Sequence, residues 1–322
     1  SWRFAADWYD SCRRASWFKE TTRDSGGRTF PVDWDWDSWE LMNVPSTWNL
    51  AKPELHYFEG SGVYVRNFRY LPQREGERAF LRFEGVQYRC TVFLNGECLG
   101  THDGGSTPFC AEISSLVRED NRLIVVVEAR RKSDRVPAEN TDWFNYGGIY
   151  RDVLLLRTPA VFIKDFFLRL VKESYDELEL DIEIEGQAAE GSARLCIPEL
   201  GVDVAVPVAG GKGHVRVAAN PELWSPDTPR LYEVELSYGE DRVGDRIGFR
   251  RICVKGDEIQ LNGKSVYLKG ICLHEDHIET GKTTDEASIR AAIAHLRELH
   301  GNYFRLAHYP HDARFARIAD DF

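Results

Sequence analysis

Apolar and polar residues alternate along most of the first 250 positions. Alternation with a period of two is typical of strands that bury one face. Strands are predicted at 62–71, 78–86, 89–102 and 121–130. Asn95-Gly96 divides the third stretch into a hairpin, because both turn positions of a type I′ turn need positive φ. Short strands separated by Gly and Asn predict a jelly-roll sandwich over residues 1–156.

The same alternation continues after residue 156, with Gly- and Pro-rich joints between the apolar stretches. Further strands are predicted at 177–186, 213–221 and 230–239. About 95 residues of such strands fit an immunoglobulin-like β-sandwich over residues 157–252.

The pattern changes in residues 253–322, where a strand at 264–274 is followed by an amphipathic helix at 284–300. A second strand is predicted at 302–309, and a second helix begins near 311. The apolar stripe of the first helix consists of Ile289, Ile293, Leu296 and Leu299, and Gly301 is placed to end the helix. Strand, helix, strand, helix predicts the beginning of a parallel α/β unit. Such a unit cannot cover its own faces, so it needs more chain or another molecule.

Composition excludes several classes of protein. The net charge is −11, with 41 basic and 52 acidic residues, which disfavours a nucleic-acid surface. The seven cysteines form no C-x-x-C pair, which disfavours a disulfide framework or zinc ribbon and favours a reducing, cytoplasmic compartment. No apolar run reaches the ~18 residues of a membrane span.

Polar residues gather at the carboxyl ends of the two last predicted strands. His274-Glu275-Asp276-His277 follows the first strand, and His308 follows the second. In a (β/α) barrel these ends form the active-site face. A single histidine at a strand end is often only a hydrogen-bonded loop residue, but two polar ends favour a functional site. The three-residue spacing of His274 and His277 disfavours the helical zinc pair of H-E-x-x-H.

Two further stretches are ambiguous from their residues alone. "ENTDWFNYGGIYRDV" (139–153) fits a loop that enters a strand, with Arg151 as a surface charge. Trp34, Trp36 and Trp39 in "DWDWDSWE" could form a sugar-stacking platform, but packing is the favoured interpretation.

Several segments together resemble glycoside hydrolase family 2, which includes β-galactosidases and β-glucuronidases. They are "EGVQYRCTVFLNGECLGTHDGGSTPFC", "DWFNYGGIYRDVLLL", "PELWSPDTPRLYEVEL", "DRIGFRRICVKGDEIQLNGKSVYLKGICLHEDH" and "NYFRLAHYP". The last matches the first half of a family signature, with Leu306 where the family usually has a small residue. The resemblance covers essentially the whole chain. It implies a mostly β fold: a jelly-roll sandwich, an immunoglobulin-like sandwich, and the first βαβα units of an incomplete (β/α)8 TIM barrel.

The resemblance also implies an activity and a set of site residues. The family hydrolyses glycosides with retention, using two glutamates on later barrel strands, so no catalytic residue is expected within this chain. The 322 residues alone are expected to be inactive. The substrate-binding residues implied are Asp142, His274, Asp276, Arg305 and His308.

The family properties leave the particular sugar open. β-Galactosidase is the first expectation and β-glucuronidase the second, with Mg²⁺ or Na⁺ only if the protein is galactosidase-like. A carbohydrate substrate and a homo-oligomer are expected. One alternative is a non-catalytic carbohydrate-binding protein built from the two β domains. Another is an interaction fragment that complements a second chain.

Overall fold

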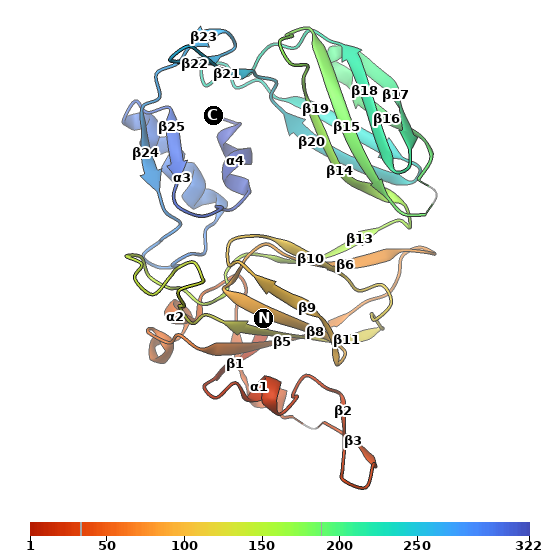
Figure 1. The fold of residues 1–322 in the computed structure, drawn as a ribbon, viewed down its shortest axis with the longest axis vertical. Helices are drawn as coiled ribbons and strands as arrows, with labels where there is room; N and C mark the ends of the chain where they lie inside the picture. Colours follow the sequence, from red (N-terminus) through yellow and green to blue (C-terminus); the bar gives the residue numbers. More distant parts are fainter. Residues whose placement is uncertain (33, 188) are drawn as a thin grey trace. The chain divides into compact units, whose positions relative to one another are not determined.

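The computed structural model describes residues 1–32, 34–187 and 189–322, and Figure 1 traces them from the red amino terminus to the blue carboxyl terminus. They form two compact units. The first consists of residues 1–157, 273–285 and 306–312, and the second of residues 158–272, 286–305 and 313–322. Strands predominate in both, which confirms the mostly β prediction.

The first unit is a sandwich of antiparallel strands. Its larger sheet has the order β4-β1-β5-β11-β8-β9, and smaller sheets join β10-β6-β13 and β12-β7. Short helices are α1 (Ser11–Arg14) and α2 (Trp48–Ala51). The strands are β1 (Trp2–Asp7), β2 (Thr21–Arg23), β3 (Thr29–Pro31), β4 (Glu40–Met42), β5 (Ser61–Arg69), β6 (Arg78–Phe83), β7 (Val86–Gln87), β8 (Arg89–Leu94), β9 (Glu97–Asp103), β10 (Phe109–Glu112), β11 (Asp120–Glu128), β12 (Gly148–Ile149) and β13 (Val153–Thr158).

The predicted hairpin is confirmed in this sheet. β8 pairs with β9 in antiparallel register, and Asn95 and Gly96 between them have φ of 51° and 87°. These positive values are the reason for the Asn-Gly pair, because a type I′ turn needs them at both positions.

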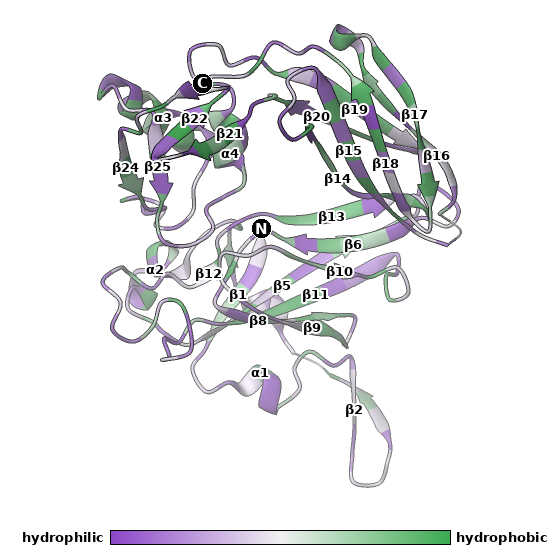
Figure 2. Cartoon of the chain, turned by 45° about the horizontal axis from the view of Figure 1, so that its top comes forward, coloured by the Kyte–Doolittle hydropathy of each residue, from purple (hydrophilic) through white to green (hydrophobic). Residues whose placement is uncertain are grey.

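Strand β11 is buried on both faces, which explains its continuous apolar run. Leu123, Val125 and Val127 belong to the core between the sheets. Ile124 and Val126 face the other way and pack in a separate cluster that includes Trp36. The segment between β1 and β4 therefore covers the outer face of the sheet. Figure 2 shows the alternation of apolar and polar residues along the strands.

The second unit contains an antiparallel sheet in the order β14-β15-β18-β17-β16-β19-β20. Alternate residues of β15, from Leu178 to Ile184, are buried in one core. The first and last strands of this order also meet, since Ile163 N donates a 2.8 Å hydrogen bond to Asp241 Oδ2. The strands are β14 (Phe162–Leu170), β15 (Glu177–Glu185), β16 (Gly191–Ile197), β17 (Val202–Ala209), β18 (Lys212–Ala218), β19 (Tyr232–Tyr238) and β20 (Asp241–Ile247).

The predicted strand at 264–274 is wrong as a single element. Residues Lys264–Ser265 form β23 in a small sheet with β21 (Ile252–Lys255) and β22 (Glu258–Leu261), whereas Gly270–Leu273 form β24. A turn at Asn262 and Gly263, with φ of 52° and 78°, reverses the chain between β22 and β23. This second Asn-Gly pair was the signal that the prediction overlooked.

The strand–helix–strand–helix order that follows is confirmed. Its elements are β24 (Gly270–Leu273), α3 (Glu286–Glu298), β25 (Tyr303–Leu306) and α4 (Arg314–Ala319). The strands β24 and β25 pair. Backbone bonds join Asn302 to Lys269 and Ala307 to Leu273, so the two strands run in the same direction.

The end of α3 differs from the prediction in two details. Ile289, Ile293 and Leu296 are buried, but Leu299 is 69% exposed because the helix ends at Glu298. The residue in the left-handed conformation is His300, with φ of 55°, rather than Gly301.

Candidate functional site

Buried amide groups hold the loop between β11 and β12 in place by hydrogen bonds. Asn145 Nδ2 donates a 2.6 Å hydrogen bond to Ala129 O, and Gly147 N donates a 2.7 Å bond to Asn49 Oδ1. A Cβ atom on Gly147 would overlap the ring of Trp48, which is fully buried. The first glycine of the pair is therefore required by close packing.

This loop carries aromatic side chains that contact residues of the first unit just after β24 and β25, the two strands predicted to begin a barrel. The ring centroid of Trp143 lies 5.9 Å from that of His274 and 5.9 Å from that of His308. The two imidazole centroids are 5.1 Å apart. Trp143 and two histidines that lie more than 130 positions further along the chain therefore form one cluster, as expected for a shared site.

Tyr146 connects the same loop to Asp276. Its hydroxyl donates a 2.7 Å hydrogen bond to Asp276 Oδ1. Burial, followed by this bond to a carboxylate, raises the pKa of the Tyr146 phenol, so the phenol stays protonated and keeps donating.

Asp142 directly precedes Trp143 and is exposed. Within the described residues, no hydrogen bond or ion pair of the protein occupies its carboxylate. Asp142, His274, Asp276 and His308 thus belong to one unit, and three of them contact the loop that carries Asp142. Their roles as substrate-binding residues stay predictions.

Arg305 belongs to the second unit. Its Nη1 lies 3.8 Å from Cys272 Sγ, and its side chain is exposed there. Its predicted place on the floor of a pocket stays a prediction. His277 accepts or donates a 3.2 Å bond with Thr284 Oγ1, and its backbone makes two bonds with Gly281.

A buried ion pair at this site was not expected from the sequence. Arg151, interpreted above as a surface charge, is 4% exposed. Its Nη2 donates to Glu275 Oε2 at 2.8 Å and to Pro310 O at 2.8 Å. The other oxygen of Glu275 accepts a 2.6 Å bond from Asp312 N. The pair therefore fixes the residues that follow both barrel strands.

Lys282 is a second buried cation that the sequence analysis missed. It is 8% exposed, and its Nζ lies 3.1 Å from Ser106 Oγ. It also lies 4.0 Å from the ring centroid of Tyr309 and 5.0 Å from that of Tyr150. Burial lowers the pKa of this ammonium group to about 8. It directly follows a glycine in a turn, and no sequence motif there indicates a buried cation.

The tryptophan-rich stretch packs against the sheet. Trp17 lies 4.4 Å from Trp34 and 6.0 Å from Trp39, and Trp36 lies 4.8 Å from Trp39, measured between ring centroids. Trp36 is buried. These contacts agree with the interpretation favoured above, that the tryptophans pack against one another and do not form a sugar-stacking platform. Asp33, the first residue of the stretch, lies outside the described residues.

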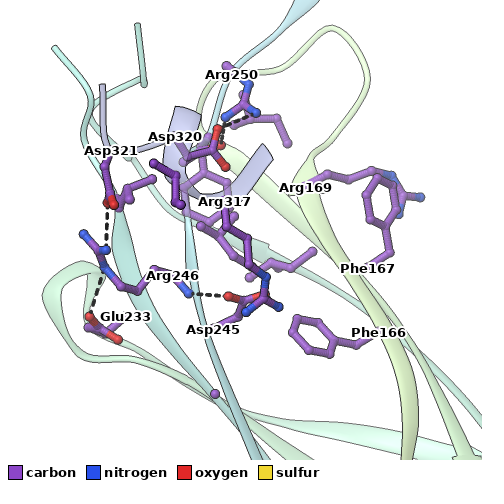
Figure 3. A pocket seen from close by; sticks show the side chains of 18 of the residues that line it. Phe166, Phe167, Arg169, Glu233, Asp245, Arg246, Arg250, Arg317, Asp320 and Asp321 are labelled. Carbon is purple, nitrogen blue, oxygen red and sulfur yellow. Dashed lines mark hydrogen bonds and ion pairs between the residues drawn. The ribbon is translucent and has the colours of Figure 1, made fainter. Parts of the chain in front are cut away.

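A cavity of about 840 Å³ in the second unit has a different character (Figure 3). Its charged residues neutralise one another: Arg250 lies 2.9 Å from Asp320, Arg246 2.8 Å from Asp321, and Arg317 3.4 Å from Asp245. These ion pairs attach α4 and the residues after it to β20 and to Arg250, which follows β20. We therefore regard the cavity as a packing groove rather than a functional site.

The described residues contain neither a metal cluster nor a membrane-spanning helix. No group of three or more His, Cys, Asp or Glu side chains among them is arranged to hold a metal ion. Among the helices described, none is both long enough and apolar enough to cross a membrane.

Family models place the chain within known proteins. Residues 1–159 match the sugar binding domain of glycosyl hydrolases family 2, residues 161–250 a further family 2 domain, and residues 252–322 the family 2 TIM barrel domain. The chain therefore belongs to glycoside hydrolase family 2, as its sequence motifs predicted.

The names of individual relatives give two different activities. A putative β-glucuronidase of Formosa agariphila is 29% identical over 303 residues, which are 88% of this chain and 37% of that protein. A β-galactosidase of Arthrobacter sp. is 30% identical over 311 residues, 89% of this chain and 30% of that protein. The structure of an uncultured Clostridium sp. β-glucuronidase matches with a TM-score of 0.82 and 28% identity, over 99% of this chain and 56% of that one. The chain thus spans between about a third and just over half of the length of these relatives.

Proposed function

We propose that this chain is the front portion of a retaining exo-β-glycosidase that hydrolyses terminal β-D-galactosides or β-D-glucuronides. It comprises a sugar-binding jelly roll (1–156), an immunoglobulin-like domain (157–252) and the start of a catalytic barrel (253–322). The observation that carries the proposal is the contact of Trp143 with both His274 and His308. It brings the jelly-roll loop of Asp142 to the ends of two parallel strands.

The chemistry of this cluster suits a sugar. An aromatic face such as Trp143 packs against the C–H face of a pyranose. The carboxylate of Asp142 is available to accept hydrogen bonds from sugar hydroxyls, and bonds to charged groups are the stronger kind. We assign substrate binding to Asp142, His274, Asp276 and His308, and extend it to Arg305 on the family resemblance.

The catalytic carboxyl pair is proposed to come from sequence outside these 322 residues. Retaining hydrolysis needs two carboxyl groups ~5 Å apart. Glu275 is next to the site, but both of its oxygens are engaged, by Arg151 and by Asp312 N. It is therefore not free to act as nucleophile or acid, and we expect the isolated chain to bind sugars without cleaving them.

The names of the relatives support both sugars, and β-galactoside remains the first proposal. If the protein is galactosidase-like, Mg²⁺ or Na⁺ would be needed for activity. We also propose that the protein forms a homo-oligomer in the cytoplasm.

Sugar binding to the chain tests the site directly. In saturation-transfer NMR, methyl β-D-galactoside or methyl β-D-glucuronide should receive saturation from the wild-type chain, and Asp142→Ala should abolish the transfer. Asp257→Ala, which removes an exposed carboxylate from the turn between β21 and β22, is the matched control. Equal transfer in Asp142→Ala and the wild type would remove Asp142 from the site.

A further inference from the structure

A small cavity in the first unit lies beside Lys282. Its volume is about 190 Å³, and its walls come from the loop 104–107, from Val136 and Pro137, and from residues 308–310, which follow β25. Trp143 and His308 also line it. None of the described residues that line this cavity is acidic, so Lys282 gives it a positive charge.

The ammonium group of Lys282 is incompletely paired. A lysine has three N–H donors, and Lys282 makes one hydrogen bond, to Ser106 Oγ. The ring of Tyr309 can receive a second N–H, since it lies 4.0 Å from Nζ. At least one donor is then left for an acceptor that the described residues do not supply.

The carboxylate of Glu275 does not take this role. Glu275 influences Lys282 electrostatically, but its oxygens bind Arg151 and Asp312 N. A buried ammonium without a bonded anion is costly, because burial disfavours the charged form unless it is paired. An anion in the cavity would supply the missing partner.

We propose that this cavity is a binding site for a small carboxylate, with Lys282 as its charged receptor. The volume limits the ligand to a few heavy atoms, because drug-sized ligands occupy ~300–1,000 Å³. The carboxylate belongs either to a free organic acid or to the acid group of a uronic sugar, since Trp143 and His308 line both this cavity and the candidate sugar site. The inference concerns binding by this chain and holds whether or not the protein hydrolyses glycosides.

Calorimetric titration at pH 7 and constant ionic strength, set with chloride, tests the site with acetate and acetamide. The two molecules have nearly the same shape and differ in charge. We expect acetate to bind to the wild-type chain and acetamide to bind at least tenfold more weakly. A parallel titration compares D-glucuronate with D-glucose: glucuronate binding more tightly than acetate assigns the site to a uronic sugar, and weaker binding assigns it to a free acid.

Lys282→Met keeps the length of the side chain and removes the charge, and it should weaken acetate binding at least tenfold. Lys255→Met, which removes an exposed lysine of the second unit, should leave it unchanged. With the wild-type chain alone, affinity should fall about tenfold for each pH unit above 8, as the ammonium loses its proton. The proposal is overturned if acetamide binds as well as acetate, if Lys282→Met binds acetate like the wild type, or if affinity is constant from pH 7 to 10.

Discussion

Arg151 Nη2 lies 2.8 Å from Glu275 Oε2, and this ion pair joins residues 124 positions apart in the sequence. The side chains are 4% and 5% exposed. Because Arg151 also binds Pro310 O and Glu275 binds Asp312 N, one buried pair fixes the segments after both barrel strands. It thereby holds His274 and His308 beside Trp143.

Removing one partner of this pair should strongly destabilise the first unit. Arg151→Met or Glu275→Met leaves the other group buried without its partner, which costs ~3–5 kcal/mol. The double variant Arg151→Met/Glu275→Met should lose less than the sum of the single losses, since no charge stays unpaired. Urea unfolding of the chain measures each change.

An exposed pair provides the control for this comparison. Arg194 and Asp203 lie 2.7 Å apart but are both more than half exposed. Arg194→Met should therefore change the free energy of unfolding by at most ~1 kcal/mol. A similar small change in Arg151→Met would show that the buried pair does not hold the site together.

Lys282 should make the stability of the chain depend on pH between about 8 and 10. Its pKa is about 8 in the folded chain, below the usual 10.5 of a lysine, because burial disfavours the charge. In this range the unfolded chain binds more protons, so the free energy of unfolding rises with pH. The full rise would be on the order of 3 kcal/mol.

The comparison of Lys282→Met with the wild type isolates this effect from other titrating groups. The variant should be more stable than the wild type at pH 7, and the difference should shrink as pH rises toward 10. Chemical unfolding at pH 7, 8, 9 and 10 measures it. A difference that stays constant over this range would mean that Lys282 titrates normally.

Gly147 should tolerate no side chain. A Cβ atom there would overlap the fully buried Trp48 ring, so Gly147→Ala should cost ~1–3 kcal/mol through overpacking. Gly244 offers a matched control, because its Cβ would meet nothing closer than Val234 O at 3.6 Å. Thermal unfolding should show a lower Tm for Gly147→Ala than for Gly244→Ala, and equal values would contradict the packing argument.

The order of strands and helices could be predicted because each depends on local patterns. The alternation of the β15 segment and the positive φ of Asn95-Gly96 are properties of short stretches. The split of the 264–274 segment was missed, although Asn262-Gly263 carries the same turn signal. Its neighbouring apolar residues suggested one longer strand.

The site was predicted only in part, since its buried polar contacts join distant segments. Asp276 and His308 were selected from the polar ends of strands and from family motifs. The burial of Arg151 depends on Glu275 and Pro310, more than 100 residues away, and nothing beside it in the sequence indicates a partner. For the same reason Lys282, whose neighbours Ser106 and Tyr150 come from the jelly roll, was not recognised.

We propose that the loop of Asp142 and the ends of the two barrel strands form one wall of a glycosidase pocket. The most direct test is kcat/KM of the full-length protein on nitrophenyl β-D-galactoside and β-D-glucuronide, for the wild type, Asp142→Ala, His308→Ala and the control Asp257→Ala. We expect one of the two substrates to be hydrolysed, a loss of at least tenfold (~1.4 kcal/mol) in each site variant, no loss in the control, and no hydrolysis by the 322-residue chain alone. Unchanged kinetics in both site variants, or hydrolysis by the chain alone, would contradict the account.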